Sequence, residues 1–97
     1  MVAMDSLDAI ERINILLREE KITRDELSRR TGISYNRWLS VIQKKTQLRH
    51  GEIQALGEIW PDYKMWLAFG EEMPEVGQIS PMTKKAQEDL GTAGKAG

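Results

Sequence analysis

The sequence predicts an all-α protein: a compact domain of five short helices followed by an extended C-terminal tail. Helix-forming Leu, Ile, Glu, Arg and Lys are frequent, whereas Asn and Pro are scarce. Apolar residues also recur at three- and four-residue steps in successive segments. The 97 residues provide one core but not two. We therefore expect one helical domain, residues 1–70, and a tail, residues 71–97.

Composition argues against several other classes of protein. There is no cysteine, so we expect neither a disulfide framework nor a thiolate metal site, as is usual in a reducing cytosol. No apolar run approaches the roughly 18–20 residues of a membrane span. The first six residues lack the basic and apolar regions of a secretory signal. We expect a cytoplasmic protein without a cofactor.

The first predicted helix runs to about Glu20, with Asp5 or Ser6 as its cap. Arg12 falls outside its apolar stripe, and we interpret the helix as core scaffold. The stripe consists of Leu7, Ala9, Ile10, Ile13, Leu16 and Leu17.

Two capped helices joined by a glycine turn come next. Thr23 precedes Glu26 by three residues, the spacing at which their side chains cap a helix start reciprocally. Gly32 supplies the left-handed residue that ends this helix, and Ser34 can cap the next one. Helices joined by so short a turn cross steeply, so residues 23–43 are predicted to form a helix-turn-helix unit.

Charge is distributed unevenly although the net charge is only −1. Residues 1–20 carry −3 and residues 51–97 carry −4, whereas residues 21–50 carry eight Lys/Arg and two acids, or +6. A solvated surface is one interpretation of such a block. Its coincidence with the helix-turn-helix unit favours contact with nucleic-acid phosphates.

The last two predicted helices of the domain contain most of the aromatic residues. One runs from His50 to Trp60, where Pro61 stops it, and the other ends before Gly70. Four large apolar residues lie close together in the second of them, and they could close the core or bind a partner. These are Tyr63, Trp66, Leu67 and Phe69.

The tail has a different composition. Residues 71–79 show no helical period and are predicted to be extended. Ser80 and Pro81 can start a short helix over residues 81–90. Residues 91–97 are predicted to be disordered. The tail could reach a second subunit or form a loose appendage.

Four features of the chain form one pattern, and they are Thr23, Glu26-Leu27, the Gly32-Ile33-Ser34 turn, and apolar Trp38 and Val41 six and nine residues after that glycine. With these features, residues 5–70 resemble the Cro/repressor (XRE) helix-turn-helix family of bacterial and phage transcription regulators. The resemblance implies a lambda-repressor-like fold and a DNA-binding repressor. It also implies that the loop after the second helix of the unit touches the DNA backbone.

The sequence departs from the family's pattern at three positions. Arg24 stands where glutamine commonly opens the second helix, Ser28 replaces a small alanine, and Trp38 is larger than the usual aliphatic residue. The family's sequence preference is therefore not carried over to this chain.

The helix over residues 35–44 is predicted to lie in a major groove and to read base edges with its first turn. Predicted base contacts are Tyr35, Asn36, Arg37 and Ser40, and predicted phosphate contacts are Arg24, Ser34, Gln43, Lys44, Lys45 and Arg49. One helix reads few base pairs, so we expect a homodimer on a palindrome with half-sites about one helical turn apart.

The alternative is a protein-interaction module, such as an antitoxin or anti-regulator, that uses the same fold to bind a protein. An enzyme is not expected. His50 is the single histidine and no cysteine is present, so nucleophile, base and zinc constellations are all missing. Neither the operator nor the sign of regulation follows from the sequence.

Overall fold

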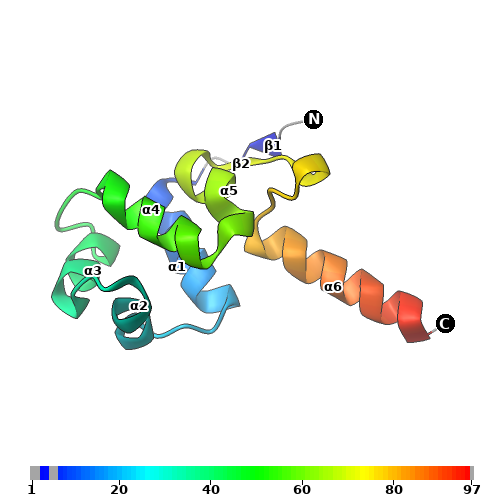
Figure 1. The fold of residues 1–97 in the computed structure, drawn as a ribbon, viewed down its shortest axis with the longest axis horizontal. Coiled ribbons are helices and arrows are strands. Elements are labelled where there is room, and N and C mark those ends of the chain that lie inside the picture. The colour runs from blue at the N-terminus through cyan, green and yellow to red at the C-terminus, as the bar shows by residue number, and fades with distance from the viewer. Residues whose placement is uncertain (1–2, 5–6, 97) are drawn as a thin grey trace.

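Helices account for most of the regular structure in the described residues, 3–4 and 7–96, of this computed structural model (Figure 1). The predicted all-α fold with five helices and a C-terminal extension is confirmed. No helix in the described ranges combines the length and the apolar character that a bilayer span requires. The elements in order are β1 (Ala3–Met4), α1 (Ala9–Glu19), α2 (Arg24–Thr31), α3 (Tyr35–Ile42), α4 (His50–Ile59), the 3-10 helix η1 (Pro61–Tyr63), α5 (Lys64–Phe69), β2 (Glu71–Glu72), the 3-10 helix η2 (Pro74–Val76) and α6 (Pro81–Ala96).

Helix α1 starts at Ala9. Its cap is Asp8, which accepts a hydrogen bond from the Glu11 backbone N–H at 2.8 Å, while the Glu11 carboxylate accepts one from the Asp8 N–H. The predicted caps Asp5 and Ser6 lie outside the described residues.

The prediction that Arg12 lies outside the buried side of α1 is wrong. Arg12 is 6% exposed. Its guanidinium donates hydrogen bonds to the backbone carbonyls of Leu7 and Leu67, the second at the end of α5. A buried cation is tolerated here because main-chain oxygens accept its N–H groups.

The core lies between α1, α2, α3, α4 and α5. The aromatic residues of η1 and α5 close it, as one of the two interpretations of that cluster predicted: Tyr63 and Trp66 are each 1% exposed, whereas Phe69 is 67% exposed. The Tyr63 hydroxyl donates to the Glu20 carboxylate at 2.6 Å, so the buried ring keeps a polar partner. The buried apolar residues are Ile13, Leu16, Leu17, Leu27, Trp38, Leu56, Trp60, Tyr63, Trp66, Leu67 and Ile79.

The predicted caps of α2 and α3 are confirmed. Thr23 accepts the Glu26 N–H and Ser34 accepts the Arg37 N–H, each at 3.1 Å. The reciprocal bond from the Thr23 N–H to the Glu26 carboxylate does not form in the described structure. Gly32 has a φ of 73°, which explains the glycine between the two helices.

The Thr31 hydroxyl braces α2 against α3. It donates to the Leu27 carbonyl at 2.7 Å and accepts the indole N–H of Trp38 at 2.9 Å. It also accepts the Ile33 N–H at 3.3 Å. Trp38 is fully buried, so these bonds fix the angle between the two helices from inside the core.

Residues 71–80 pack onto the domain. β2 pairs antiparallel with β1, and the Ile79 N–H donates to the Asp62 carbonyl at 2.9 Å. The Gln78 amide donates to the Pro61 carbonyl and accepts the Met65 N–H, both at 3.0 Å. Residues 71–79, which were predicted to be extended, are interrupted by the 3-10 helix η2.

Helix α6 is longer than the predicted 81–90, and it continues to Ala96 where disorder was predicted. Ser80 caps it by accepting the Thr83 N–H at 3.2 Å. Adding residues to an existing helix costs much less than starting one, which explains the extension through a glycine-containing sequence. Gly97 lies outside the described residues. α6 projects away from the other helices (Figure 1).

The brace predicts the effect of Thr31→Val. This nearly isosteric change leaves the buried Trp38 N–H without an acceptor, so we expect the free energy of unfolding to fall by about 1–3 kcal/mol, measured by urea denaturation. In a Trp38→Phe background, which has no N–H to satisfy, the same change should cost clearly less. An equal cost in both backgrounds would contradict the brace.

Candidate nucleic-acid interface

Helix α3 turns one side to the core and the other to solvent. Trp38 and Val41 are fully buried. Asn36 and Gln43 are exposed on the opposite side, and Ser40 is partly exposed there. Leu39, three residues after Asn36 and four before Gln43, belongs to this outer side and is partly exposed. Leu39 was not among the residues predicted for this side, although its helical spacing from Asn36 could have identified it.

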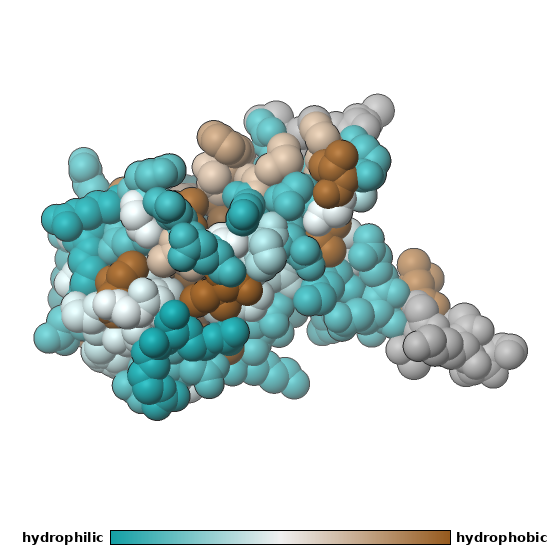
Figure 2. Space-filling view, in the orientation of Figure 1, coloured by the Kyte–Doolittle hydropathy of each residue, from teal (hydrophilic) through white to brown (hydrophobic). Residues whose placement is uncertain are grey.

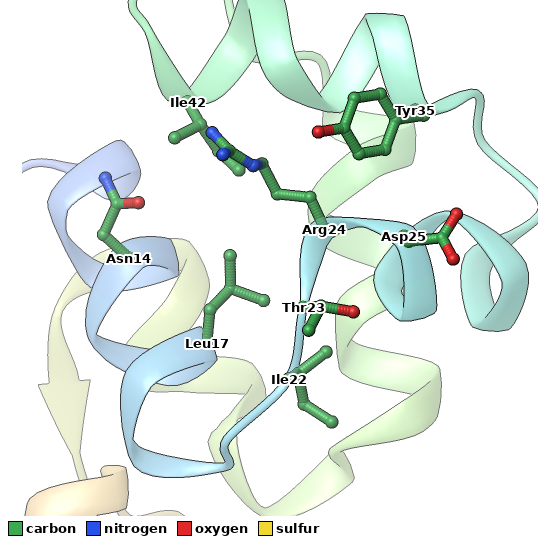
Figure 3. Close-up of a pocket in the computed structure, with 8 residues that line it drawn as sticks. All are labelled: Asn14, Leu17, Ile22, Thr23, Arg24, Asp25, Tyr35 and Ile42. Atoms are coloured by element: carbon green, nitrogen blue, oxygen red, sulfur yellow. The ribbon is translucent and has the colours of Figure 1, made fainter.

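A hollow lies beside the first turn of α3. Its volume is about 420 Å³, and it lies between the end of α1 and the starts of α2 and α3. In Figure 3 the Arg24 side chain reaches across it toward Ile42, and the Tyr35 hydroxyl points into the same space. Tyr35 is 40% exposed. Two predicted contact residues from different helices, Arg24 and Tyr35, therefore come together.

A second hollow, of about 360 Å³, involves the same turn of α3. It is lined by Arg37 together with Arg49, Ile33 and the start of α4. An arginine from outside α3 therefore lies on each of these two surfaces: Arg24 beside Tyr35 and Arg49 beside Arg37. Asn36 comes between Tyr35 and Arg37 in the chain.

The Arg37 side chain, a predicted base contact, is held by other residues. It donates from Nε to Glu52 Oε2 at 2.5 Å and from Nη2 to Glu52 Oε1 at 2.9 Å. The remaining bonds go to the Thr46 hydroxyl at 3.0 Å and to the Gln47 carbonyl at 2.7 Å. Arg37 therefore ties α3 to α4 and to the loop between them.

Glu52 is 4% exposed. Burial raises the pKa of its carboxyl. The hydrogen bonds from Arg37 and from the Arg49 N–H, together with the positive charges of both arginines, lower this pKa by more than burial raises it, so it lies below the usual value. The bond to Glu52 also raises the pKa of Arg37. Both groups are therefore charged at neutral pH, and the pair fixes the start of α4 against α3.

Lys44 ends α3 in an uncommon conformation. Its φ is 60°, the left-handed region in which glycine usually follows a helix. The Lys44 N–H donates to the Val41 carbonyl and the Lys45 N–H to the Ser40 carbonyl, the pattern of a Schellman motif. Lys44 Nζ lies 3.0 Å from Asp8 Oδ2, with both side chains about half exposed. The bond from the Glu11 N–H and then that from Lys44 lower the pKa of Asp8 to about 2.

Three of the predicted phosphate contacts, unlike Lys44, have no acidic partner in the described structure. Arg24, Lys45 and Arg49 are exposed, and none forms an ion pair among the described residues. Ser34 and Gln43 are exposed at the two ends of α3, as its N-cap and C-cap.

Among the described residues, no group of three His, Cys, Asp or Glu is arranged to hold a metal ion.

The Arg37–Glu52 pair predicts the effect of Glu52→Gln. The change leaves the guanidinium without its countercharge, so we expect the free energy of unfolding at pH 7 to fall by roughly 3 kcal/mol. This is the low end for a buried pair because the Arg37 side chain keeps 19% of its surface exposed. Chemical denaturation measures it, and Glu58→Gln, an exposed glutamate on the same helix, is the matched control.

The same variant should change the response to acid. Because the folded-state pKa values of Glu52 and Asp8 are lowered, their stabilisation is complete above the unfolded-state values and is lost as the pH falls through the folded-state values. Glu52→Gln should therefore lose less stability than wild type between neutral pH and about pH 3. A Glu52→Gln protein with wild-type stability at pH 7 and in acid would contradict this role.

No protein-family model matches the chain, and no curated protein matches it significantly. Among solved structures, it is similar to Pf6r from the filamentous phage Pf6 of Pseudomonas aeruginosa PA01, with 35% sequence identity and a TM-score of 0.71. The alignment covers 88% of this chain and 99% of Pf6r. The chain therefore belongs to the same family as Pf6r.

Proposed function

We propose that the protein is a sequence-specific DNA-binding transcription regulator of the Cro/repressor (XRE) type. In this proposal α2, the Gly32 turn and α3 form the helix-turn-helix unit, and α3 enters the major groove. The observation that carries the proposal is the first turn of α3. It is exposed at Tyr35 and Asn36, while Arg24 and Arg49 lie beside it without ion pairs in the described structure.

Charge supports this face over the rest of the surface. A duplex surface repels acids and attracts cations that are not neutralised internally. The excess charge of residues 21–50 is +6, and both flanking segments are acidic. Of the cations in the basic block, Arg29, Arg37 and Lys44 form ion pairs with Asp25, Glu52 and Asp8, which leaves Arg24, Lys45 and Arg49 beside α3 for phosphates.

Base reading is assigned to the outer side of α3. Asn36 has the amide that pairs with adenine in a bidentate manner, and Tyr35 can reach a base or the backbone. Ser40 and the added candidate Leu39 present carbon atoms suited to a thymine methyl. Arg37 is assigned a positioning role instead of the base contact expected from the sequence, because four hydrogen bonds to Glu52, Thr46 and Gln47 already engage its guanidinium.

Backbone binding is assigned to the residues around α3. Arg24, Lys45 and Arg49 provide cations, and Ser34 and Gln43 provide polar groups at the ends of the helix. Lys44 contributes positive charge only in part, because Asp8 neutralises it. Its left-handed conformation closes the end of α3 and begins the loop that carries Lys45 and Arg49.

The regulator acts in this proposal as a homodimeric repressor on a palindrome in the cytoplasm, without catalytic activity. A single α3 contacts only a few base pairs, so two copies are needed for useful specificity. The half-sites are then separated by a whole number of helical turns, so that both copies contact one face of the duplex.

The second candidate is a protein-interaction module. The exposed Phe69 and the hollow of about 380 Å³ that it lines with Ile53 and Met65 favour it, because such apolar surface suits a protein partner. This surface lies on α4 and α5, whereas the cations flank α3, so the two functions can be separated by mutation.

Two substitutions on α3 and its loop test the DNA face. Asn36→Ala should lower affinity for the preferred sequence by about 1–3 kcal/mol and relax discrimination, because a base contact is lost. Lys45→Ala should weaken binding to all sequences alike and reduce the slope of log K against log salt by about 1. Fluorescence anisotropy at several salt concentrations measures both effects, with duplexes from the region upstream of the protein's own gene.

Arg18→Ala is the matched control, since this exposed cation lines the hollow beside α6 and neither of the two hollows beside α3. It should leave affinity and salt slope unchanged. If Asn36→Ala and Lys45→Ala also bound like wild type, the assignment of the face would be wrong. Failure of the wild type to prefer any duplex, with a protein captured through Phe69, would favour the interaction module.

A further inference from the structure

Helix α6 has an inner side that contacts the domain. Pro81 is buried, and Lys84, Lys85 and Glu88 line a hollow with residues of α1 and with Tyr63. Lys84 Nζ lies 5.8 Å from the centre of the Tyr63 ring. The opposite side of α6 therefore faces solvent.

Three apolar residues at four-residue intervals follow the outer side: Met82, Ala86 and Leu90, which we call the outer row. Met82 is 40% exposed and Leu90 is 73% exposed. α6 stands apart from the other helices in Figure 1, and hydrophobic surface remains on the projecting arm in Figure 2. No described residue of the chain covers this row.

We propose that the outer row binds the outer row of a second copy of the chain, with the two α6 helices antiparallel. Met82 of one copy then lies opposite Leu90 of the other, and the two Ala86 residues meet at the two-fold axis. Rows at four-residue intervals are the ridges that interlock in the commonest class of helix packing. The small side chain of Ala86 allows close approach at the centre.

Charge complementarity selects a second copy as the occupant. Lys85 and Asp89 are exposed and lie on one flank of the outer row, where Lys85 also borders the inner hollow, and neither forms an ion pair in the described part of the chain. Within one helix, lysine four residues before an acid is the weaker order for pairing. In an antiparallel pair, Lys85 of each copy lies near Asp89 of the other, so the surface is complementary to itself.

The size of the contact sets its strength. One helix crossing buries less surface than the roughly 800 Å² per partner of a standard stable interface. We therefore expect a weak, reversible dimer in the absence of DNA. DNA with two half-sites should stabilise this dimer, because binding of one copy raises the effective concentration of the other. The inference deepens the proposed function by supplying the second copy that a palindrome requires, but the α6 contact itself can be measured without DNA.

Charge exchange tests the contact in the full chain. Lys85→Asp makes both flanking positions acidic and Asp89→Lys makes both basic, so each variant alone should associate with itself about tenfold more weakly than wild type, or worse. An equimolar mixture of the two should associate at least as tightly as wild type, because opposite charges then meet. Sedimentation velocity over a wide concentration range measures all three, and circular dichroism checks that the helices are retained.

Two further variants locate the interface. Ala86→Glu should abolish self-association, because it places two like charges at the two-fold axis. Phe69→Lys, which alters the exposed aromatic residue of α5, should leave self-association unchanged. A wild type that is monomeric throughout, a mixture that does not recover association, or a dimer lost only in Phe69→Lys would overturn the proposal.

Binding to a duplex with a single half-site separates the two proposals. The α6 variants should bind it like wild type and lose only the cooperative binding to the two-half-site duplex. A dimer that responds to the α6 charges but prefers no DNA sequence would remove the proposed function and leave the α6 interface in place.

Discussion

The burial of Trp38 behind α3 is the constraint on which the rest of the molecule depends. This side chain is fully buried, and its N–H is bonded to Thr31 at the end of α2. A single large anchor therefore fixes the angle between α2 and α3 and the rotation of α3 about its own axis. Once that rotation is fixed, Asn36, Leu39 and Gln43 must face solvent, because they lie on the opposite side of the helix.

The cations on and beside α3 fall into two groups, those that form ion pairs within the chain and those that do not. Glu52 and Asp8 neutralise Arg37 and Lys44, and these pairs attach α4 and α1 to the two ends of α3. Arg24, Lys45 and Arg49 remain exposed without ion pairs in the described structure. A basic block in the sequence is thus divided into positioning charges and charges available to a polyanion, and the second group supports the proposed DNA interface.

The local features of the fold could be predicted from the sequence because each depends on near neighbours. The Thr23 and Ser34 caps, the Gly32 turn and the buried Trp38 all follow from spacing along the chain. Long-range partners could not be predicted. Nothing in helical periodicity indicates that Arg12 is buried against Leu67, or that Arg37 is held by a glutamate 15 positions away. The assignment of Arg37 to a base failed to anticipate this partner, whereas the assignments of Asn36 and Tyr35 remain predictions.

Chemical-shift mapping tests the central claim most directly. Titration of the ¹⁵N-labelled protein with a duplex that contains its preferred site would report each backbone amide separately. The account predicts that the largest shifts fall on Ser34 to Lys45, on Arg24 and on Arg49, and that the amides of α5 change little. Shifts concentrated on α4 and α5 with α3 unaffected, or no shifts at saturating DNA, would contradict it.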